Sequence, residues 1–194
     1  MPPGQPPARH PSNGDFDALL AAARENRPEA WERLYRWLAP GVAGYLRMQG
    51  AHEADDLTSD VFLAVFRRLG DFAGSEPSFR SWVFTVAHSR LVDERRRWAR
   101  RPATVPLDTA PEVFTREANP ADAALQSLEL AEIEAVCGRL PAEQRSVLLL
   151  RVIGDLSIDQ VAQILGKSPG AIKQLQRRGF EAVRNLLARE GVTL

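Results

Sequence analysis

LSIDQVAQILGKSPGAIKQLQRRGFEAVRNLL, from Leu156 to Leu187, is the most informative stretch of the chain because it holds two helix starts a short distance apart. Ser157 and Gln160 form a capping-box pattern, in which a hydroxyl and an amide satisfy two backbone N–H groups at a helix start. Gly166 can end that helix in the left-handed conformation. Ser168 offers a second N-cap, followed by a proline, which fits the first helical position. The pattern predicts a helix-turn-helix.

The second of these helices has one apolar side and one polar, basic side. The apolar side carries residues at helical spacing: Ile172, Leu175, Gly179, Ala182, Val183 and Leu186. In a helix-turn-helix, the first turns of the second helix enter the major groove. Lys173 and Arg177 can pair with phosphate or guanine, and the amides of Gln174 and Gln176 can bond adenine edges. We therefore predict DNA binding, with an ordinary helical hairpin and a solvated charged face as the alternative.

Composition limits the choice of partners. The chain has 194 residues, enough for one or two small domains, and 25 basic residues balance 25 acidic ones. Overall charge therefore does not indicate nucleic acid. The charge is segregated, however, with a net +5 over 67–101, −6 over 102–134 and +4 over 166–184. Two basic segments around an acidic one fit two separate nucleic-acid contacts, although solvated helix faces would give the same counts.

Residues that carry chemistry are sparse. Cys137 is the only cysteine, and His10, His52 and His88 lie far apart without ligand spacing. We find no phosphate loop, nucleophile elbow or carboxylate pair, so the sequence predicts no catalytic residue, no metal, no cofactor and no enzyme activity. No run approaches about 18 apolar residues, and residues 1–14 are rich in Pro and Gly without an apolar core. We expect a cytoplasmic protein with a disordered N-terminal tail and no membrane insertion.

Helical periodicity dominates the first half. Apolar residues recur at helical spacing in four groups: Phe16, Leu19, Leu20 and Ala23; Trp31, Leu34, Tyr35 and Leu38; Leu57, Val61, Val65 and Leu69; Val83, Val86, Ala87 and Leu91. The second helix is expected to enter through Pro28 and to be interrupted at Pro40, because an internal proline removes a backbone hydrogen bond. The third spans Asp55 to Leu69 and the fourth Ser78 to Arg100. Together they predict a small all-helical bundle.

The second half begins with a break in periodicity. Residues 102–121 contain four prolines and no repeating apolar pattern, which predicts an acidic linker. Two helices should follow, marked by Leu125, Leu128, Ala135 and Val136, and by Val147, Leu148 and Val152 between Pro141 and Gly154. The expected fold class is all-α with two small helical domains. The expected organisation is a tail over 1–14, a first domain over 15–101, a linker over 102–121 and a second domain over 122–194.

Three segments in this order carry a family resemblance that covers Asp15 to Arg189. They are ADDLTSDVFLAVFRRL from Ala54, FAGSEPSFRSWVFTVAHSRLVDERRR from Phe72, and LPAEQRSVLLLRVIGDLSIDQVAQILGKSPGAIKQLQRR from Leu140. They resemble regions 2.2, 2.3 with 2.4, and 4 of bacterial sigma-70 family sigma factors of the extracytoplasmic-function (ECF) type. The resemblance implies a subunit that binds RNA polymerase core and directs initiation. It would read the minus-35 and minus-10 promoter elements and capture the melted non-template strand.

The resemblance also implies three sets of site residues. Core polymerase would bind at Asp55, Asp56, Leu57, Asp60, Val61, Ala64, Arg67 and Arg68. The minus-10 element would contact Phe72, Phe79, Arg80, Trp82, His88, Ser89, Asp93, Arg96, Arg97 and Arg100. The minus-35 element would contact Ser168, Pro169, Gly170, Ala171, Lys173, Gln174, Gln176 and Arg177. Implied partners are the clamp of the largest polymerase subunit, the flap of the second-largest subunit, promoter DNA in duplex and single-stranded form, and an anti-sigma factor.

Residue chemistry agrees with these roles but also allows plainer ones. Stacking on an aromatic ring contributes about 1–3 kcal/mol per unpaired base, so the rings near Arg80 could drive melting by capture; core packing is the alternative. Ser89, Asp93, Arg96 and Arg100 fall within an arc of about 60° on a helix. The acids at the start of the third helix could dock on a partner or simply favour the helix dipole.

The sequence departs from the family pattern at two places. Family members often have Asn where this chain has Ser89, and Thr-Val-Lys-Ser-Arg-Leu where it has residues 171–176. These differences affect the promoter sequence that is read rather than the role.

The sequence is also compatible with two other functions. One alternative function is a helix-turn-helix regulator that does not join polymerase. Another is a protein-interaction module with incidental basic faces.

Overall fold

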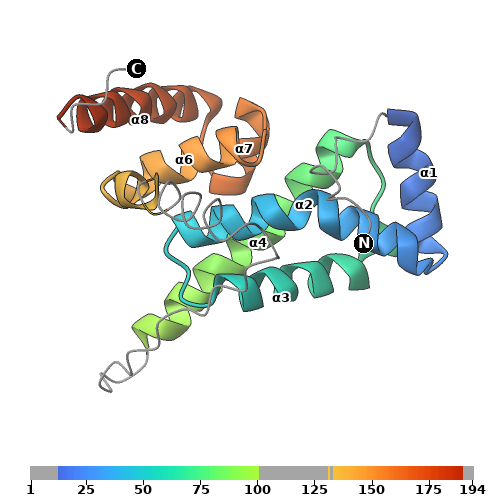
Figure 1. Cartoon of the computed structure of the whole chain (residues 1–194). Coiled ribbons are helices and arrows are strands. Elements are labelled where there is room, and N and C mark those ends of the chain that lie inside the picture. The colour runs from blue at the N-terminus through green and yellow to red at the C-terminus, as the bar shows by residue number, and fades with distance from the viewer. Residues whose placement is uncertain (1–12, 101–130, 132, 190–194) are drawn as a thin grey trace, which may run out of the picture.

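The computed structural model describes residues 13–100, 131 and 133–189, and every regular element within these residues is helical (Figure 1). In chain order the elements are α1 (Asn13–Arg24), α2 (Pro28–Met48), α3 (Ala54–Arg67), the 3-10 turn η1 (Leu69–Asp71), α4 (Glu76–Ala99), α6 (Ala142–Val152), α7 (Ile158–Leu165) and α8 (Pro169–Arg189). Residues 133–138 are also helical. The predicted all-α fold class is confirmed. The predicted linker and the markers Leu125 and Leu128 lie outside the described residues.

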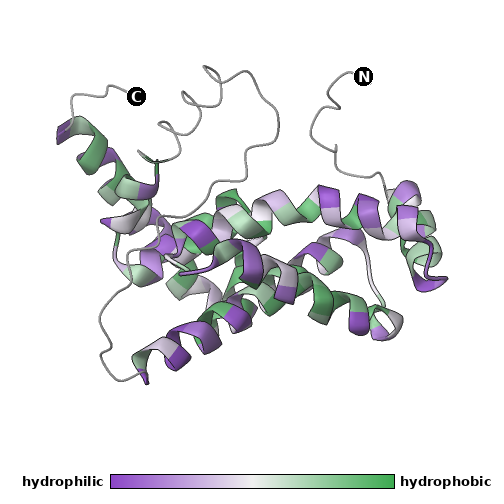
Figure 2. Cartoon of the chain, turned by 60° about the horizontal axis from the view of Figure 1, so that its bottom comes forward, coloured by the Kyte–Doolittle hydropathy of each residue, from purple (hydrophilic) through white to green (hydrophobic). Residues whose placement is uncertain are grey.

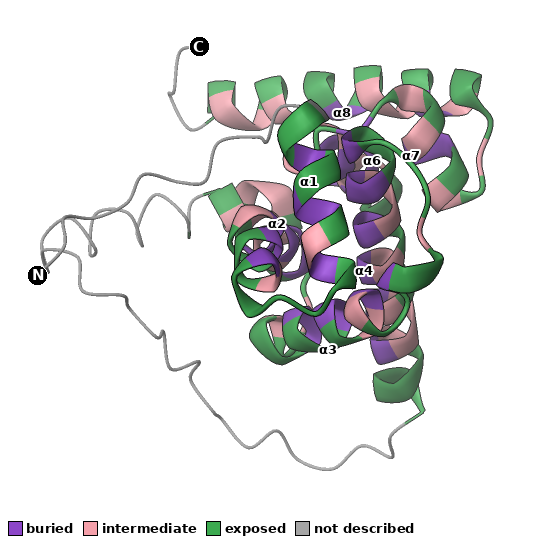
Figure 3. Ribbon diagram, turned by 90° about the vertical axis from the view of Figure 1, so that its right-hand side faces the viewer, coloured by how far each residue is buried: buried purple, intermediate pink, exposed green. Residues whose placement is uncertain are grey.

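Helices α1 to α4 pack around one apolar core. The inward-facing residues predicted for the first and third helices are all buried there, although α3 ends at Arg67 and Leu69 lies in η1. They are Phe16, Leu19, Leu20, Ala23, Leu57, Val61, Val65 and Leu69. Figure 3 shows the buried residues gathered where these helices face one another. Burial of such side chains stabilises the fold by about 25 cal/mol per Å² of apolar surface. Of the tail predicted over 1–14, Asn13 and Gly14 belong to α1.

Helix α2 continues through Pro40, so the predicted interruption there is wrong. The helix keeps one buried face on both sides of the proline, with Leu34 and Leu38 before it and Val42 and Leu46 after it. Pro40 itself is exposed, so its ring lies on the solvent side of α2 and leaves the buried face intact. An internal proline costs about 3 kcal/mol, which is less than the burial of that many apolar side chains contributes.

Helix α4 begins at Glu76, two residues before the predicted start, and extends beyond the bundle. Val83, Ala87 and Leu91 are fully buried, as predicted, while Val86 is half-buried. From residue 96 to residue 100 every side chain is exposed. Figure 2 shows this end of the helix as a hydrophilic projection. The C-terminal turns of α4 are therefore available to a partner.

Helices α6, α7 and α8 form the predicted helix-turn-helix with one preceding helix. At the start of α7 the Gln160 backbone N–H donates to Ser157 Oγ over 3.2 Å, and the Ser157 N–H donates to Gln160 Oε1 over 2.8 Å. Gly166 ends α7 with a φ of 63°. The predicted capping box and left-handed cap are therefore confirmed. Helix α8 packs across α6, where Gly179 lies against Leu148.

The two halves of the chain lie against each other, with α6 beside α2 and α7 beside α4 (Figure 1). The amide nitrogen of Gln49, at the end of α2, donates to Ser146 Oγ of α6 over 2.8 Å, and both residues are buried. Gly41 of α2 faces Ile153, and a Cβ there would lie 3.7 Å from the Ile153 carbonyl oxygen, an ordinary van der Waals distance. The described residues thus form two helical units in contact.

Candidate nucleic-acid interfaces

The first turns of α8 present a polar face to solvent. Ser168 caps the helix, since its Oγ accepts a hydrogen bond from the Ala171 N–H over 3.2 Å. Lys173, Gln174 and Arg177 are exposed along this face. Nη1 of Arg177 lies 2.9 Å from a carboxylate oxygen of Glu181, one turn further on. Lysine, arginine and glutamine on the exposed side of a second helix are the groups that read base edges and hold phosphates.

Two of the other residues predicted for the minus-35 contact do not lie fully on this face. Gln176 is half-buried, and its Oε1 is enclosed without a hydrogen-bond partner within the described residues. Ala171 is also half-buried, next to the fully buried Ile172. The helical period places position 176 one turn after Ile172, on the side that packs against α6. Gln176 is therefore turned away from Gln174, contrary to the prediction that both amides point to DNA.

The aromatic residues around the start of α4 form a cluster, and Phe79 is at its centre. Phe79 is only 1% exposed, and its ring lies 5.5 Å from Phe16, 6.4 Å from Trp37 and 5.2 Å from Phe72, centroid to centroid. No base can stack on a ring enclosed in this way. The predicted role of Phe79 in strand capture is wrong for this arrangement, and the alternative of core packing holds.

Phe72 and Trp82 remain partly accessible at the edge of the cluster. Their rings are stacked with centroids 5.3 Å apart and planes 12° apart, and both side chains are half-buried. The guanidinium of Arg24 donates to the Phe72 carbonyl oxygen and so anchors the loop before α4. These two rings are the aromatic surfaces of the cluster that unpaired bases could reach.

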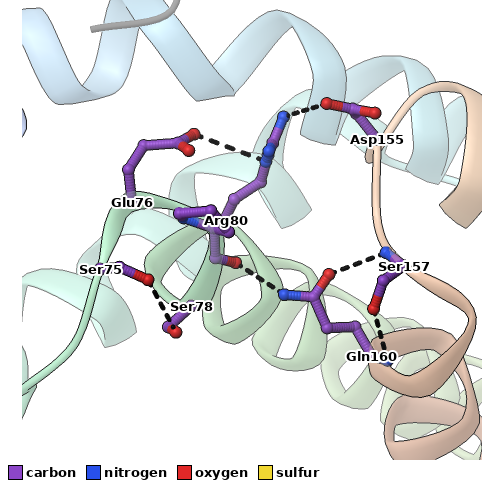
Figure 4. Close-up of polar contacts among 8 residues, drawn as sticks. Ser75, Glu76, Ser78, Arg80, Asp155, Ser157 and Gln160 are labelled. Carbon is purple, nitrogen blue, oxygen red and sulfur yellow. Dashed lines mark hydrogen bonds and ion pairs between the residues drawn. The ribbon is translucent and has the colours of Figure 1, made fainter. Parts of the chain in front are cut away.

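Arg80 is buried between two carboxylates rather than presented to solvent (Figure 4). Its Nη1 lies 2.6 Å from Oδ2 of Asp155, and its Nε lies 3.6 Å from Oε1 of Glu76. The side chain is only 10% exposed. The prediction of Arg80 as an open cationic contact is therefore wrong in this arrangement. The sequence could not indicate it, because Asp155 is 75 positions further along the chain.

The C-terminal half of α4 presents the predicted polar face. Ser89, Arg96 and Arg100 are exposed, Asp93 is half-exposed, and Arg96 lies 3.9 Å from Asp93. His88 lies elsewhere, with Nδ1 2.8 Å from the hydroxyl of the buried Tyr45. Burial and the positive charge of Arg95 lower the pKa of His88. His88 is therefore a neutral packing residue rather than part of the exposed face.

The residues of α3 and its C-cap that were predicted to bind polymerase fall into two sets, one exposed and one buried. Asp55, Asp56, Asp60, Arg67 and Arg68 are exposed, and Ala64 is half-buried. Leu57 and Val61 are 5% and 0% exposed in the core, so their predicted contact with a partner is wrong. Leu63, which is not among the predicted residues, is 51% exposed on the same helix and is a further candidate for a contact. A large apolar side chain off the buried stripe was the signal that could have identified it.

A pocket of about 140 Å³ lies between α3 and α4, beside these acids. Its lining is mostly acidic: Glu53, Asp56, Leu57, Asp60, Glu94, Arg97 and Trp98. Glu94 is 7% exposed, and its Oε2 is buried without a hydrogen-bond partner within the described residues. The pocket therefore has a negative charge suited to a cationic group. Sequence spacing alone could not bring α3 and the end of α4 together.

The described part of the chain was also searched for side chains that could hold a metal ion and for membrane-spanning helices. Across 13–100 and 133–189 we find no group of three His, Cys, Asp or Glu side chains placed to bind a metal ion. Within those same ranges, no helix is long and apolar enough to cross a bilayer. Cys137 is half-buried, and burial raises the pKa of its thiol.

Comparison with known proteins finds two regions of sigma factors in the chain. Residues 24–101 match the family described as sigma-70 region 2, and residues 130–183 match sigma-70, region 4. The ECF RNA polymerase sigma factor BldN of Streptomyces coelicolor is 32% identical over 185 residues, which are 93% of this chain and 69% of that protein. The ECF RNA polymerase sigma factor ShbA of Streptomyces griseus is 30% identical over 178 residues, 87% of this chain and 93% of that one.

A solved structure also resembles the whole fold. CnrH, whose structure was determined in complex with the cytosolic domain of CnrY, matches with a TM-score of 0.62 and 25% sequence identity. The match covers 89% of this chain and 96% of CnrH.

Proposed function

Because the chain belongs to the sigma-70 family, as an ECF RNA polymerase sigma factor, we propose that it recognises minus-35 and minus-10 promoter elements for polymerase core. We further propose that it captures the melted non-template strand. This role requires one surface for polymerase and two for the promoter. We assign the three surfaces to helices α3, α4 and α8. The two functional domains in this proposal are residues 15–101 and 122–194, and residues 102–121 are the linker between them.

The minus-35 surface in this proposal is the N-terminal part of α8. Gln174 is exposed and has an amide that can pair with an adenine edge. Lys173 and Arg177 are exposed beside it, while Ser168, Pro169 and Gly170 bring the positive end of the helix to the surface. Backbone N–H groups at a helix start favour a phosphate. The arrangement supports entry of α8 into the major groove.

The minus-10 surface is the exposed side of α4 with the aromatic edge beside it. Ser89, Arg96 and Arg100 form a polar and basic face for the phosphate backbone. Phe72 and Trp82 offer the half-buried rings on which flipped bases can stack. Stacking contributes about 1–3 kcal/mol per base, comparable to the few kcal/mol that unstacking a base costs. Strand separation can therefore be driven by capture.

The polymerase surface in this proposal is the exposed side of α3. Its acidic character favours a protein partner in addition to DNA. Asp55, Asp56 and Asp60 are exposed, and the pocket beside them contains a carboxylate oxygen of Glu94 that has no hydrogen-bond partner among the described residues. Such a surface repels DNA but suits a basic protein partner, with Leu63 as an apolar contact at its edge. The clamp of the largest polymerase subunit is the partner that the family resemblance implies for this helix.

Two further protein partners follow from the resemblance. The flap of the second-largest polymerase subunit would contact the C-terminal domain, where Val152 at the end of α6 is 66% exposed. An anti-sigma factor would hold the chain inactive. In support, the structurally similar CnrH was solved with the cytosolic domain of CnrY bound.

Titration of the purified chain with polymerase core on a promoter library tests the proposed function. A sigma factor gives open complexes, detected by permanganate reactivity of unpaired thymines, only when both core and chain are present. A regulator that does not join polymerase would bind duplex DNA without core and would open none. A pure protein-interaction module would do neither, and either of these results would overturn the proposal.

A further inference from the structure

The pocket between α3 and α4 has a buried carboxylate in its wall. The two helices lie side by side (Figure 1), and residues from both line this pocket of about 140 Å³. Glu94 of α4 is 7% exposed, and its Oε2 has no hydrogen-bond partner within the described residues. Burial of an ionised carboxylate without a partner is costly. The pocket therefore suits a ligand that brings a hydrogen-bond donor to Glu94.

Two arginines lie near Glu94, and each makes a hydrogen bond elsewhere. The charge of Arg95 interacts with Glu94, but its Nη2 donates to the carbonyl oxygen of Gln49 and, over 3.2 Å, to Gln49 Oε1. Arg97 lines the pocket with an exposed side chain, and its Nε donates to the Asp93 carbonyl oxygen over 3.4 Å. Four carboxylates line the pocket together with this single guanidinium, so the lining has a formal charge of −3.

An aromatic ring and an apolar side chain complete the lining. Trp98 lines the pocket and is 40% exposed. Its ring stacks on His52, with centroids 4.0 Å apart and planes 29° apart, and this contact holds it in place. Leu57 adds apolar surface. A hydrated metal ion gains little from such walls, whereas a planar organic cation gains from both the carboxylates and the ring.

We propose that this pocket binds a guanidinium group. A guanidinium has several N–H donors in one plane, so it can donate to Glu94 and to the exposed rim acids while its face packs on Trp98. The rim acids are Glu53, Asp56 and Asp60. The pocket is also large enough, since one water needs only about 10–15 Å³. Either a free guanidinium compound or an arginine side chain of a protein partner supplies this group.

Occupation of the pocket affects polymerase binding, and this step rests on the proposed function. Asp56 and Asp60 line the pocket and also belong to the surface assigned to polymerase core. A free guanidinium compound in the pocket neutralises part of the charge of that surface. It therefore weakens the attraction between this surface and a basic partner.

Titration of the full chain with methylguanidinium tests the pocket directly. At constant ionic strength, the NMR signal of the Trp98 indole N–H reports binding; Trp98 is one of four tryptophans, and Trp98→Phe assigns its signal. The signal should shift and saturate with methylguanidinium. It should shift much less with methylammonium, which has no plane, with urea, which has no charge, or with magnesium ion. No saturable shift, or an equal response to methylammonium or magnesium ion, overturns the proposal.

Substitutions in the pocket test which carboxylates bind the group. Glu94→Gln keeps the size of the side chain and should raise the Kd for methylguanidinium roughly tenfold, because a charge-assisted hydrogen bond is lost. Asp60→Asn, at the exposed rim, should raise the Kd by up to about fivefold and keeps the test open if Glu94→Gln does not fold. The matched control is Glu29→Gln, the same change at an exposed position of α2 outside the lining. An unchanged Kd in the pocket variants, or an equal rise in the control, overturns the site.

Affinity for polymerase core, with and without methylguanidinium, separates the two sources of the group. If a free compound is the ligand, core binding weakens only in samples that contain methylguanidinium, and less so in Glu94→Gln. If an arginine of polymerase is the ligand, Glu94→Gln lowers core affinity without methylguanidinium. Core binding that responds to neither overturns the link between the pocket and polymerase. Failure of the proposed function is distinguishable, because core-dependent open complexes would be absent in every chain while the NMR titration would still report the pocket.

Discussion

The hydroxyl of Tyr45 lies 2.8 Å from Nδ1 of His88 and joins the buried faces of α2 and α4. Tyr45 is fully buried, and burial raises the pKa of its hydroxyl well above the usual range. The His88 ring is half-buried, with the positive charge of Arg95 nearby. Both effects favour the neutral imidazole, so protonation of His88 opposes folding.

This relationship predicts a pH dependence of stability. Since burial, followed by the charge of Arg95, lowers the pKa of His88 from 6.5, the unfolded chain binds this proton more readily than the folded chain. The free energy of unfolding should be constant between about pH 7.5 and about pH 8 and should decrease as the pH falls below about 6.5. His88→Asn, which can keep a hydrogen bond to Tyr45, should flatten the profile between about pH 7.5 and 5.5. Urea unfolding at each pH checks this, with the exposed His52→Asn as the control.

Packing of α8 on α6 predicts opposite effects at two glycines. A Cβ on Gly179 would lie 2.9 Å from Leu148 Cδ1 and 3.0 Å from its Cγ, whereas nothing lies within 4 Å of a Cβ on Gly170. Gly170→Ala should stabilise the chain by up to about 1 kcal/mol through helix propensity. Gly179→Ala should be less stable than Gly170→Ala by about 1–3 kcal/mol because of overpacking. Equal unfolding free energies in urea would contradict this packing.

The aromatic cluster predicts that two of its rings have different roles. Phe79→Ala should lower the free energy of unfolding by about 3–5 kcal/mol, because it empties a buried site. Phe72→Ala, at a half-buried ring, should have a smaller effect on stability but impair opening of a duplex promoter more than binding to a pre-melted bubble. Urea unfolding and open-complex assays on the two templates measure these effects. A larger stability loss from Phe72→Ala would reverse the assignment.

The acidic face of α3 predicts a charge-dependent affinity for polymerase core. Asp55→Lys with Asp56→Lys should weaken core binding by roughly tenfold or more. The reason is that charged residues at the edge of an interface attract a partner of opposite charge, and these changes would make them repel a basic partner. Both side chains are exposed, so the change in stability should stay within about 0.5 kcal/mol even though Asp55 lies 3.3 Å from Arg47. Asp17→Lys with Glu29→Lys, at two exposed acids on α1 and α2, is the matched control. Core affinity that falls equally in both pairs would indicate a non-specific charge effect.

Local signals predicted the helix-turn-helix well, while tertiary packing decided the rest of the fold. The capping box at Ser157 and the left-handed Gly166 act within a few residues, so the sequence contains the whole cause. Pro40 is a local signal too, yet the buried face of α2 on either side of it outweighs the lost hydrogen bond. Burial of that face depends on α3 and α4, which no local pattern describes.

The candidate site was predicted less completely, because residue type does not determine exposure. Phe79 and Trp82 look alike in sequence, and only the position of α1 and α2 makes Phe79 a core residue. Arg80 has the charge of a phosphate contact, but the fold places Asp155 beside it. Gln176 differs from Gln174 by about 200° around the helix, so a closer use of the helical period would have separated them.

The exposed face of α8 predicts separable effects on minus-35 recognition. Gln174→Ala should change the preferred base at one or two adjacent positions, by about 1–3 kcal/mol for a bidentate pair. Arg177→Ala, which removes a phosphate contact, should weaken all minus-35 sequences alike and lower the salt slope by about one. Gln176→Ala is the matched control, because the Gln176 amide oxygen is enclosed, and it should leave the preference unchanged. Selection from a pool randomised at minus 35 by the full chain with polymerase core, at two salt concentrations, measures all three. A change of preference in Gln176→Ala but not in Gln174→Ala would mean that α8 presents a different face to the groove.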